Sequence, residues 1–585
     1  MKQTLTPWAI AILLISSPAF AQTPAPPFVY GVASGDPLPN QVIIWTKLAP
    51  ADTTQPATVN WRVAADTAFI QIVQSGLVTT DNSTDFTVKV DVAGLQPNTW
   101  YYYDFETGGI HSIRGRTKTA PVGQTTHIRF AVVTCAKYSK GYFNAYESIS
   151  ARNDLDAVIH LGDYIYEGNG SSDDIRPFDP AYRCSTLIDY RTRYRQYHQD
   201  LSLIKARQNF PWINVWDDHE TSNDAWQNGS EHWPDSAGFA ALKTAALKVY
   251  FEWIPIRQDS AHPTRIYRQF QYGNLVDLFM LDTRLEGREK QYPFADSNMT
   301  IINDTNRTLL GHAQYNWLIN GLSSSSAHWR VIAQQVMMAP ALLAGKPLNE
   351  DQWDGYPAER AKLFQYIMQN DIDNIIVVTG DVHASFANDL PLDVQLYDDA
   401  TGNGSVGVEF ITPAVVSSQS AFGNVPFSIV KANDPHIQYA DFTQRGYLIL
   451  DITEAKVQAD FYYVSTTDTP VYTLNLGASL YTLSGTRHIY RQPVSVNRDP
   501  TAYFALLPNP AKNILTIQPG EISGSLTFQI FDTNGAMIKQ FPPTTLRQNR
   551  QDIHLDISKL PSGTYILKIY SGAKLLHVSK FVVAK

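Results

Sequence analysis

The spacing of hydrophobic and polar positions changes twice along the 585-residue chain. Over about 28–120, short alternating runs such as QVIIWTKL, ATVNWRVA, FTVKVDV and WYYYDFET are separated by the turn signals GDPLPN and LQPN. Short alternating strands with turns between them are typical of a small antiparallel β-sandwich. We therefore expect 28–120 to form an N-terminal all-β sandwich.

The segment from about 127 to 495 follows a different pattern. Near-continuous apolar runs, among them IRFAVVT, DAVIHL, LVDLFML and NIIVVTG, alternate with helix-like segments such as FNAYESISAR and AALKTAALKVYFEW. Strands that are apolar on both faces and alternate with helices indicate a layered domain of sheets and helices. From about 505 to 585 the alternation of period two returns, with TNG and SGAK as hairpin turns, and predicts a C-terminal all-β sandwich.

The first 21 residues resemble an export signal. They contain Lys2, the apolar run WAIAILLI, which is too short to cross a bilayer, and the small-residue sequence AFA. We expect 1–21 to be a signal peptide that is cleaved after Ala21; an apolar N-terminal strand or anchor is the alternative. The rest of the chain has no run of about 18 apolar residues, so we expect the mature protein to be soluble.

Composition and charge narrow the class of protein. A chain that is 44% hydrophobic and 12% aromatic is globular, and 585 residues are enough for several domains. The net charge of −9 offers no basic face for nucleic acid. Cys135 and Cys184 are the only cysteines, which excludes a disulfide scaffold but leaves a single pairing open.

Polar residues of metal-ligand type follow four of the apolar strands predicted within 127–495. They are Cys135 after FAVVT, Asp163 and Tyr166 after AVIHLG, Asp217, Asp218, His219, Glu220 and Asn223 after INVW, and Asp381 and His383 after IIVVTG. Sheets flanked by helices place their ligand sites at the carboxyl ends of strands, so we expect these side chains to converge. Asp381 and His383 are two positions apart and should point the same way.

These residue types suit metal ions. Thiolate, phenolate and carboxylate together suit trivalent iron, whereas carboxylate and amide oxygens suit Ca²⁺, Mg²⁺ or Mn²⁺. Two neighbouring metals can clamp the attacking and leaving oxygens of a phosphoryl transfer. Each residue alone has an ordinary explanation: Asp163 as a helix cap, Cys135 as a small buried hydrophobe, Tyr166 as packing. The joint pattern is what indicates a metal site.

The ordered motifs FVYGVASGDPLPNQVIIWTKL, FAVVTCAKY, HLGDYIYEG, VWDDHETSND, LDTR, QVMM and GDVHAS resemble the PhoD-type alkaline phosphatases and phosphodiesterases over about 28–465. That family is related to the purple acid phosphatases and the calcineurin-like metallophosphoesterases. The resemblance implies an α+β fold with a four-layer αββα catalytic sandwich, here flanked by the two all-β sandwiches. It also implies Fe³⁺ and one or two Ca²⁺ as cofactors, with other divalent metals as alternatives.

The resemblance assigns four residues to the iron side: Cys135, Asp163, Tyr166 and His383, with Asp163 bridging to the second metal. Asp381 matches a ligand on the calcium side. Either Asn223 or Asp218 takes the remaining ligand position there, and the sequence leaves both open.

The implied catalytic roles fall on the WDDHE loop. His219 would contact the phosphate or protonate the leaving group, with Asp218 as the second catalytic candidate, and Asp217 and Glu220 would orient the ligands. The implied reaction is direct attack of a metal-bound hydroxide on a phosphomonoester or phosphodiester, for phosphate scavenging. A phospholipase D-like phosphodiesterase and a non-catalytic surface protein with a structural metal are the alternatives. We expect a monomer.

The motifs LPNPAKN and LPSGTY within 505–585 resemble the C-terminal sorting domain of the type IX secretion system of Bacteroidetes. The resemblance implies a Gram-negative source, recognition by outer-membrane secretion machinery, and release or attachment at the cell surface. An ordinary carbohydrate-binding or spacer sandwich is the alternative.

Overall fold

The computed structural model describes residues 23–585 except 235, 344–345, 419, 421–422, 424, 492–503, 520–523, 533–536, 547–551 and 572–573. The predicted signal peptide lies outside the described residues. The chain divides into two compact units, Met1–Gln492 and Pro493–Lys585.

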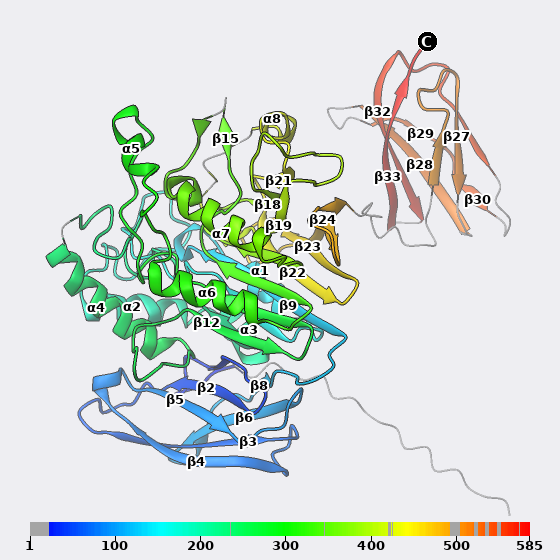
Figure 1. Cartoon of the computed structure of the whole chain (residues 1–585). Helices are drawn as coiled ribbons and strands as arrows, with labels where there is room; N and C mark the ends of the chain where they lie inside the picture. Colours follow the sequence, from blue (N-terminus) through cyan, green and yellow to red (C-terminus); the bar gives the residue numbers. More distant parts are fainter. Residues whose placement is uncertain are drawn as a thin grey trace, which may run out of the picture. The chain divides into compact units, whose positions relative to one another are not determined.

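A large mixed sheet runs through the first unit (Figure 1). Its strand order is β25 (Tyr490–Arg491), β24 (Leu474–Leu483), β23 (Lys456–Val464), β22 (Arg445–Thr453), β9 (His127–Ala136), β10 (Ala157–His160), β11 (Pro211–Asn214), β1 (Val32–Gly35), β2 (Gln41–Lys47) and β5 (Thr87–Ala93), with β20 (Ala414–Val416) paired to β9. Strands β9, β10 and β11 are parallel, so their carboxyl ends meet at one edge.

The N-terminal region contributes to this sheet as well as to a second one. The second sheet contains β4 (Ile72–Thr80), β3 (Ala57–Ala64), β6 (Trp100–Thr107), β7 (Ile110–His111) and β8 (Gly115–Lys118). An apolar core that includes Val42, Val59 and Tyr103 joins the two layers. However, β1 pairs in parallel with β11, with Ser34 opposite Pro211. One layer of the N-terminal region is therefore continuous with the large sheet that contains β9, β10 and β11. The sequence analysis did not foresee this continuity.

A seven-stranded sheet lies beside the large one. Its order is β12 (Arg268–Tyr272), β13 (Val276–Met280), β14 (Trp329–Gln334), β17 (Ile375–Thr379), β19 (Ser405–Ile411), β18 (Ser385–Pro391) and β21 (Ile437–Asp441). Strands β13, β14, β17 and β19 are parallel. A separate two-stranded hairpin joins β15 (Leu342–Leu343) and β16 (Lys346–Pro347).

The alternation of side chains explains how the layers stack. Val331 and Val378 belong to a core shared with Phe130 of the large sheet, whereas Ile332 and Val377 face a second core beneath the helices. Helices α6 (His312–Ser324) and α7 (Pro357–Gln369) cover that second face, and α1 (Asn144–Ser150), α2 (Leu187–Tyr197), α3 (Leu201–Asn209) and α4 (Ser236–Trp253) pack into the first core. The remaining helical segments are α5 (Met299–Ile302), α8 (Phe427–Asn433) and the single 3₁₀ turns Asn82–Thr84, Tyr138–Lys140, Asp296–Asn298 and Trp353–Gly355.

The second unit is all β. One sheet has β26 (Phe504–Leu507), β27 (Ile514–Pro519) and β31 (Ile553–Asp556); the other has β29 (Met537–Gln540), β28 (Gly524–Phe531), β32 (Gly563–Ser571) and β33 (Lys574–Val583), with β30 (Thr544–Leu546) paired to β28. Leu515, Phe528 and Leu567 share its apolar core. The predicted TNG turn and the centre of the predicted SGAK turn lie outside the described residues. None of the described helices in either unit is long and apolar enough to cross a bilayer.

Candidate metal centre

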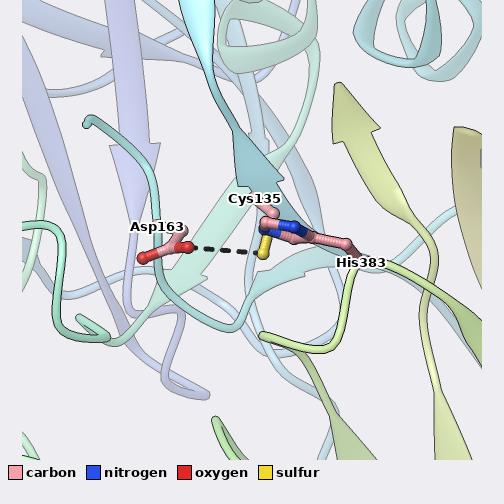
Figure 2. Close-up of side chains that lie close together, drawn as sticks. All are labelled: Cys135, Asp163 and His383. Carbon is pink, nitrogen blue, oxygen red and sulfur yellow. Dashed lines mark hydrogen bonds between the residues drawn. The ribbon is translucent and has the colours of Figure 1, made fainter. Parts of the chain in front are cut away.

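Three overlapping groups of potential ligands form where β9, β10, β11 and β17 end. The groups are Cys135, Asp163 and His383; Asp163, Asp218 and His219; and Asp217, Asp218 and Asp381, and in each the ligand atoms lie within 4.8 Å of one another. Figure 2 shows the first group, with Asp163 and His383 reaching the Cys135 thiol from different loops. Asp163 and Asp218 each belong to two groups, so the three form one continuous centre.

The backbone bends sharply at the residues that present these side chains. Cys135, Asp163, Asp381 and His383 all have left-handed φ angles, of 54°, 57°, 60° and 58°. This conformation is uncommon for residues with a side chain and persists only where the surroundings enforce it. Gly162 has a φ of 102°, and a Cβ there would lie 2.4 Å from the backbone nitrogen of Asp217. Only glycine therefore lets the β10 end approach the β11 end this closely.

The Cys135 side of the centre is made of neutral or easily neutralised groups. The Cys135 thiol donates to Asp163 Oδ2 at 3.5 Å, and Tyr166 Oη lies 3.0 Å from His383 Nε2. Burial raises the pKa of the Cys135 thiol well above its usual value and does the same for Tyr166. Burial also lowers the pKa of His383 to about 3. A thiolate and a phenolate in this position therefore require a cation beside them.

The Asp381 side is made of carboxylates around one buried guanidinium. Arg284 Nε donates to Asp217 Oδ1 at 2.5 Å, its Nη2 to Asp381 Oδ1 at 3.3 Å, and its Nη1 to both oxygens of Asp351 at 2.8 Å. Gln352 Nε2 donates to Asp381 Oδ2 at 2.6 Å. Burial raises the pKa of Asp381 to about 6, despite the opposing effect of Arg284.

Several carboxylate oxygens in the centre have no partner. Asp163 Oδ1, Asp217 Oδ2 and Asp218 Oδ1 are buried and accept no hydrogen bond from the described residues. A buried acceptor without a partner costs roughly 1–3 kcal/mol, and more when it is charged. The unpartnered oxygens and the thiol, phenol and imidazole groups beside them fit a centre that binds more than one cation.

His219 is held in place by an acid that sequence reasoning overlooked. Its Nδ1 lies 2.6 Å from Glu167 Oε2, and its ring packs 4.1 Å from the ring of Tyr166. Burial would lower the pKa of His219, but Asp163, Asp218 and Glu167 raise it well above the usual value. When no cation is bound, these three carboxylates therefore favour the charged imidazolium, and a ring nitrogen of His219 lies within 4.8 Å of Asp163 and Asp218 oxygens.

The remaining residues of the WDDHE loop have different surroundings. Glu220 accepts backbone N–H groups of Asp163, Tyr164 and Asp217, at 3.2, 2.6 and 2.8 Å, and so joins two strand ends. The Asn223 amide nitrogen donates to Glu231 at 2.8 Å. This bond uses the amide nitrogen and leaves the Asn223 carbonyl oxygen unassigned, whereas Asp218 belongs to two of the ligand groups.

Sequence reasoning missed four residues that contact the centre: Glu167, Arg284, Gln352 and Ser417. The signal for Arg284 was available, because LDTR follows the apolar strand LVDLFML in the same way as the other ligands follow theirs. Ser417 Oγ lies 3.0 Å from His383 Nε2, but no pattern around it distinguishes it from other serines.

The sequence left the pairing of the two cysteines open, and the loop 168–185 contains two arginines, Arg176 and Arg183. Cys135 and Cys184 are both free thiols. Arg176 pairs with Asp200 at 2.6 Å and stacks on Tyr138, which is a structural role. Arg183 Nη1 donates to Glu167 Oε1 at 2.6 Å and thereby supports the acid that holds His219.

Comparisons with known proteins show the family of the chain. Residues 130–461 match the family described as PhoD-like phosphatase, 15–121 match the PhoD-like phosphatase N-terminal domain, and 505–584 match the secretion system C-terminal sorting domain. Alkaline phosphatase D of Bacillus subtilis (strain 168) is 37% identical over 458 residues, which cover 74% of this chain and 77% of that protein. A solved structure described as the structure of PhoD aligns with a TM-score of 0.73 at 34% identity, over 81% of this chain and 93% of that one.

Proposed function

The chain belongs to the PhoD-like phosphatases, and from this premise we propose that it hydrolyses phosphomonoesters and phosphodiesters outside the cell to release phosphate. The observation that carries the proposal is the convergence of three ligand groups through the shared Asp163 and Asp218. A phosphoryl group bound there would meet cations on one side and the His219 edge on the other.

We propose that Fe³⁺ binds at Cys135, Tyr166 and His383, and Ca²⁺ at Asp381 and Asp218, with Asp163 shared. The thiol and phenol favour a trivalent ion, and the carboxylates favour a hard divalent one. Asp218 is preferred to Asn223 as the ligand because it has a buried unpartnered oxygen and belongs to two of the ligand groups. When bound, such cations neutralise phosphate charge and lower the pKa of a water molecule.

The chain's own residues supply orientation and the proton. We propose that His219 donates a proton from Nε2 to the departing oxygen, while Glu167 contacts Nδ1 and orients the ring. Glu220 and Arg284 fix the strand ends and carboxylates, so the ligands do not have to reorganise during the reaction.

Metal analysis combined with assays tests the proposal. We expect iron and calcium in the purified protein, a visible absorption band from the Tyr166 phenolate, and turnover of p-nitrophenyl phosphate or bis-p-nitrophenyl phosphate that a chelator abolishes. No turnover of either ester after resupply of iron, calcium, manganese or zinc would refute a phosphoesterase. Turnover of the diester alone would restrict the substrate class.

The C-terminal sorting domain supports secretion or cell-surface display through the type IX system. We propose that residues 1–21 direct the first export step and that the source is a Gram-negative bacterium of the Bacteroidetes type. Deletion of 505–585 should leave the protein in the periplasm of such a host, whereas the full chain should reach the medium or the surface. We also propose that the mature enzyme is a monomer, which sedimentation analysis tests.

A further inference from the structure

A cavity of about 170 Å³ opens directly beside Asp381 and His383. Its other walls come from the segment that follows β14, which contributes Met337, Ala339 and Ala341, and from Leu348 at its mouth. The first three of these wall residues are buried, whereas Leu348 is 41% exposed. The cavity therefore leads from the candidate metal centre to solvent along an apolar wall.

The polar residues that line the cavity are Asn349, Gln352, Asp354, Asp381, His383 and Ser420, and two of them, Gln352 and Asp354, are bound to the protein on several sides. Gln352 donates to Asp381 and accepts the backbone N–H of Met337, and Asp354 accepts the N–H of Ala341 while pairing with Arg360 at 2.7 Å. No Lys or Arg is present among the described residues that line it. Away from Asp381 and His383, the cavity therefore offers a ligand mainly apolar surface.

The wall is also preformed. The N–H groups of Met338 and Ala339 both donate to the buried carboxylate of Glu409, at 2.8 and 3.0 Å. Together with the bonds to Gln352 and Asp354, these contacts fix the backbone of 337–341. The small side chains of Ala339 and Ala341 keep the space open, because a longer side chain at either position would project into it.

We propose that this cavity binds an uncharged, apolar organic group of the phosphate ester, about the size of a single ring, and so sets the substrate preference. The size fits, since an engineered apolar protein cavity of about 150 Å³ binds benzene. Apart from cations bound at the centre itself, an anionic substituent in the cavity would meet the carboxylate of Asp354, whose partner Arg360 is not among the described residues that line the cavity. This inference rests on the proposed phosphoesterase function, because it places the phosphorus at the neighbouring centre.

Inhibition by phosphonates tests the proposal without any effect of leaving-group reactivity. Benzylphosphonate and ethylphosphonate would compete with whichever p-nitrophenyl ester the enzyme hydrolyses. We expect benzylphosphonate to bind at least about tenfold more tightly, the scale of discrimination that apolar pockets achieve. 4-Phosphonobutyrate, whose carboxylate is too far from phosphorus to close a small chelate ring, and 2-aminoethylphosphonate should bind no more tightly than ethylphosphonate.

Three variants connect the preference to the cavity. Ala339→Leu should bring the ratio of the two inhibition constants close to one, and Leu348→Ser at the exposed mouth should lower it. Ala241→Leu, on the exposed face of α4, makes the same change outside the cavity and should keep the wild-type ratio. If Ala339→Leu does not fold, Leu348→Ser decides.

Equal inhibition by the two phosphonates in the wild type, or an unchanged ratio in the cavity variants, would overturn the inference. Tighter binding of either charged phosphonate than of benzylphosphonate would do the same. In each of these cases the protein still hydrolyses the p-nitrophenyl ester, so the proposed function stands. Absence of that hydrolysis would instead be a failure of the proposed function.

Discussion

When no cation is bound, the two sides of the candidate centre limit their negative charge in different ways. On the Cys135 side, the thiol, the phenol and the imidazole are neutral when no cation is bound, because burial shifts their pKa values in that direction. On the Asp381 side, the carboxylates are numerous, and Arg284 supplies a permanent positive charge among them. His383 and Asp381 are only two residues apart, yet they belong to opposite sides.

This difference indicates how each side would respond to metal. Binding on the Cys135 side must release protons, since the thiol and phenol become ligands only when they are ionised. Binding on the Asp381 side instead joins an existing ion cluster in which Arg284 already offsets part of the charge. The two sides should therefore be separable by mutation, except at Asp163, which lies between them.

The largest effect is expected from Asp163→Asn. Because Asp163 belongs to two ligand groups, this change should deplete both metals and lower kcat/KM at least about a thousandfold, or about 4 kcal/mol of transition-state stabilisation. Steady-state assays and elemental analysis measure both. Asp173→Asn, at a carboxylate that is 73% exposed, is the matched control and should behave like the wild type. Retention of full iron and calcium by Asp163→Asn would contradict a shared ligand.

The next test separates the two sides. Cys135→Ser should lose iron and the visible band while it retains calcium, and Asp381→Asn should lose calcium while it retains the band. Metal content and absorption spectra of the two purified variants give the comparison directly. If both variants lose the same metal, the division into two sides is wrong.

Arg284→Gln should damage the Asp381 side alone. Removal of one partner from a buried ion cluster typically costs about 3–5 kcal/mol, because it leaves uncompensated charge, here on Asp217 and Asp381, whereas Asp351 keeps its pair with Arg288. We expect a loss of that order in the free energy of unfolding of the chelated protein, measured with denaturant, and a smaller loss after calcium is restored. The visible band of the reconstituted variant should be unchanged.

The smallest expected effect is a pH dependence that only the metal-free protein shows. Burial raises the pKa of Asp381 from its usual 3.8 to about 6 in the folded state, so between these values the folded chain holds a proton that the unfolded chain has released. Stability should therefore fall as pH rises from about 4 to about 6. Thermal melting of chelated wild type and chelated Asp381→Asn should show a shallower fall in the variant. Identical pH profiles would exclude Asp381 as a contributor.

Much of the site could be predicted because each ligand follows an apolar strand in the sequence. The strands that carry Cys135, Asp163 and His383 are buried on both faces, and such runs are easy to recognise. Convergence then follows from the rule that parallel strands end at one edge. The left-handed backbone at Cys135 was not predictable, because Cys carries no local preference for it, whereas Asp and His are enriched in that conformation.

Contacts between distant segments were beyond sequence reasoning. Gln352 reaches Asp381 from a loop with no motif, and Ser417 reaches His383 from a segment whose pattern is that of an ordinary strand end. The parallel pairing of Ser34 with Pro211 could not be predicted either, because the composition of a strand does not indicate which strand it pairs with. Glu167 and Arg284 differ from these, because both lie in motifs that pointed to the site.

The pairing of β1 with β11 determines whether the catalytic region can be produced without the N-terminal region. β11 leads directly into Asp217, and its outer edge is hydrogen-bonded to β1 of the N-terminal region. A protein that begins at residue 127 would expose that edge as unpaired backbone, which is a template for aggregation. The N-terminal layer is thus part of the catalytic scaffold and cannot be exchanged as an independent module.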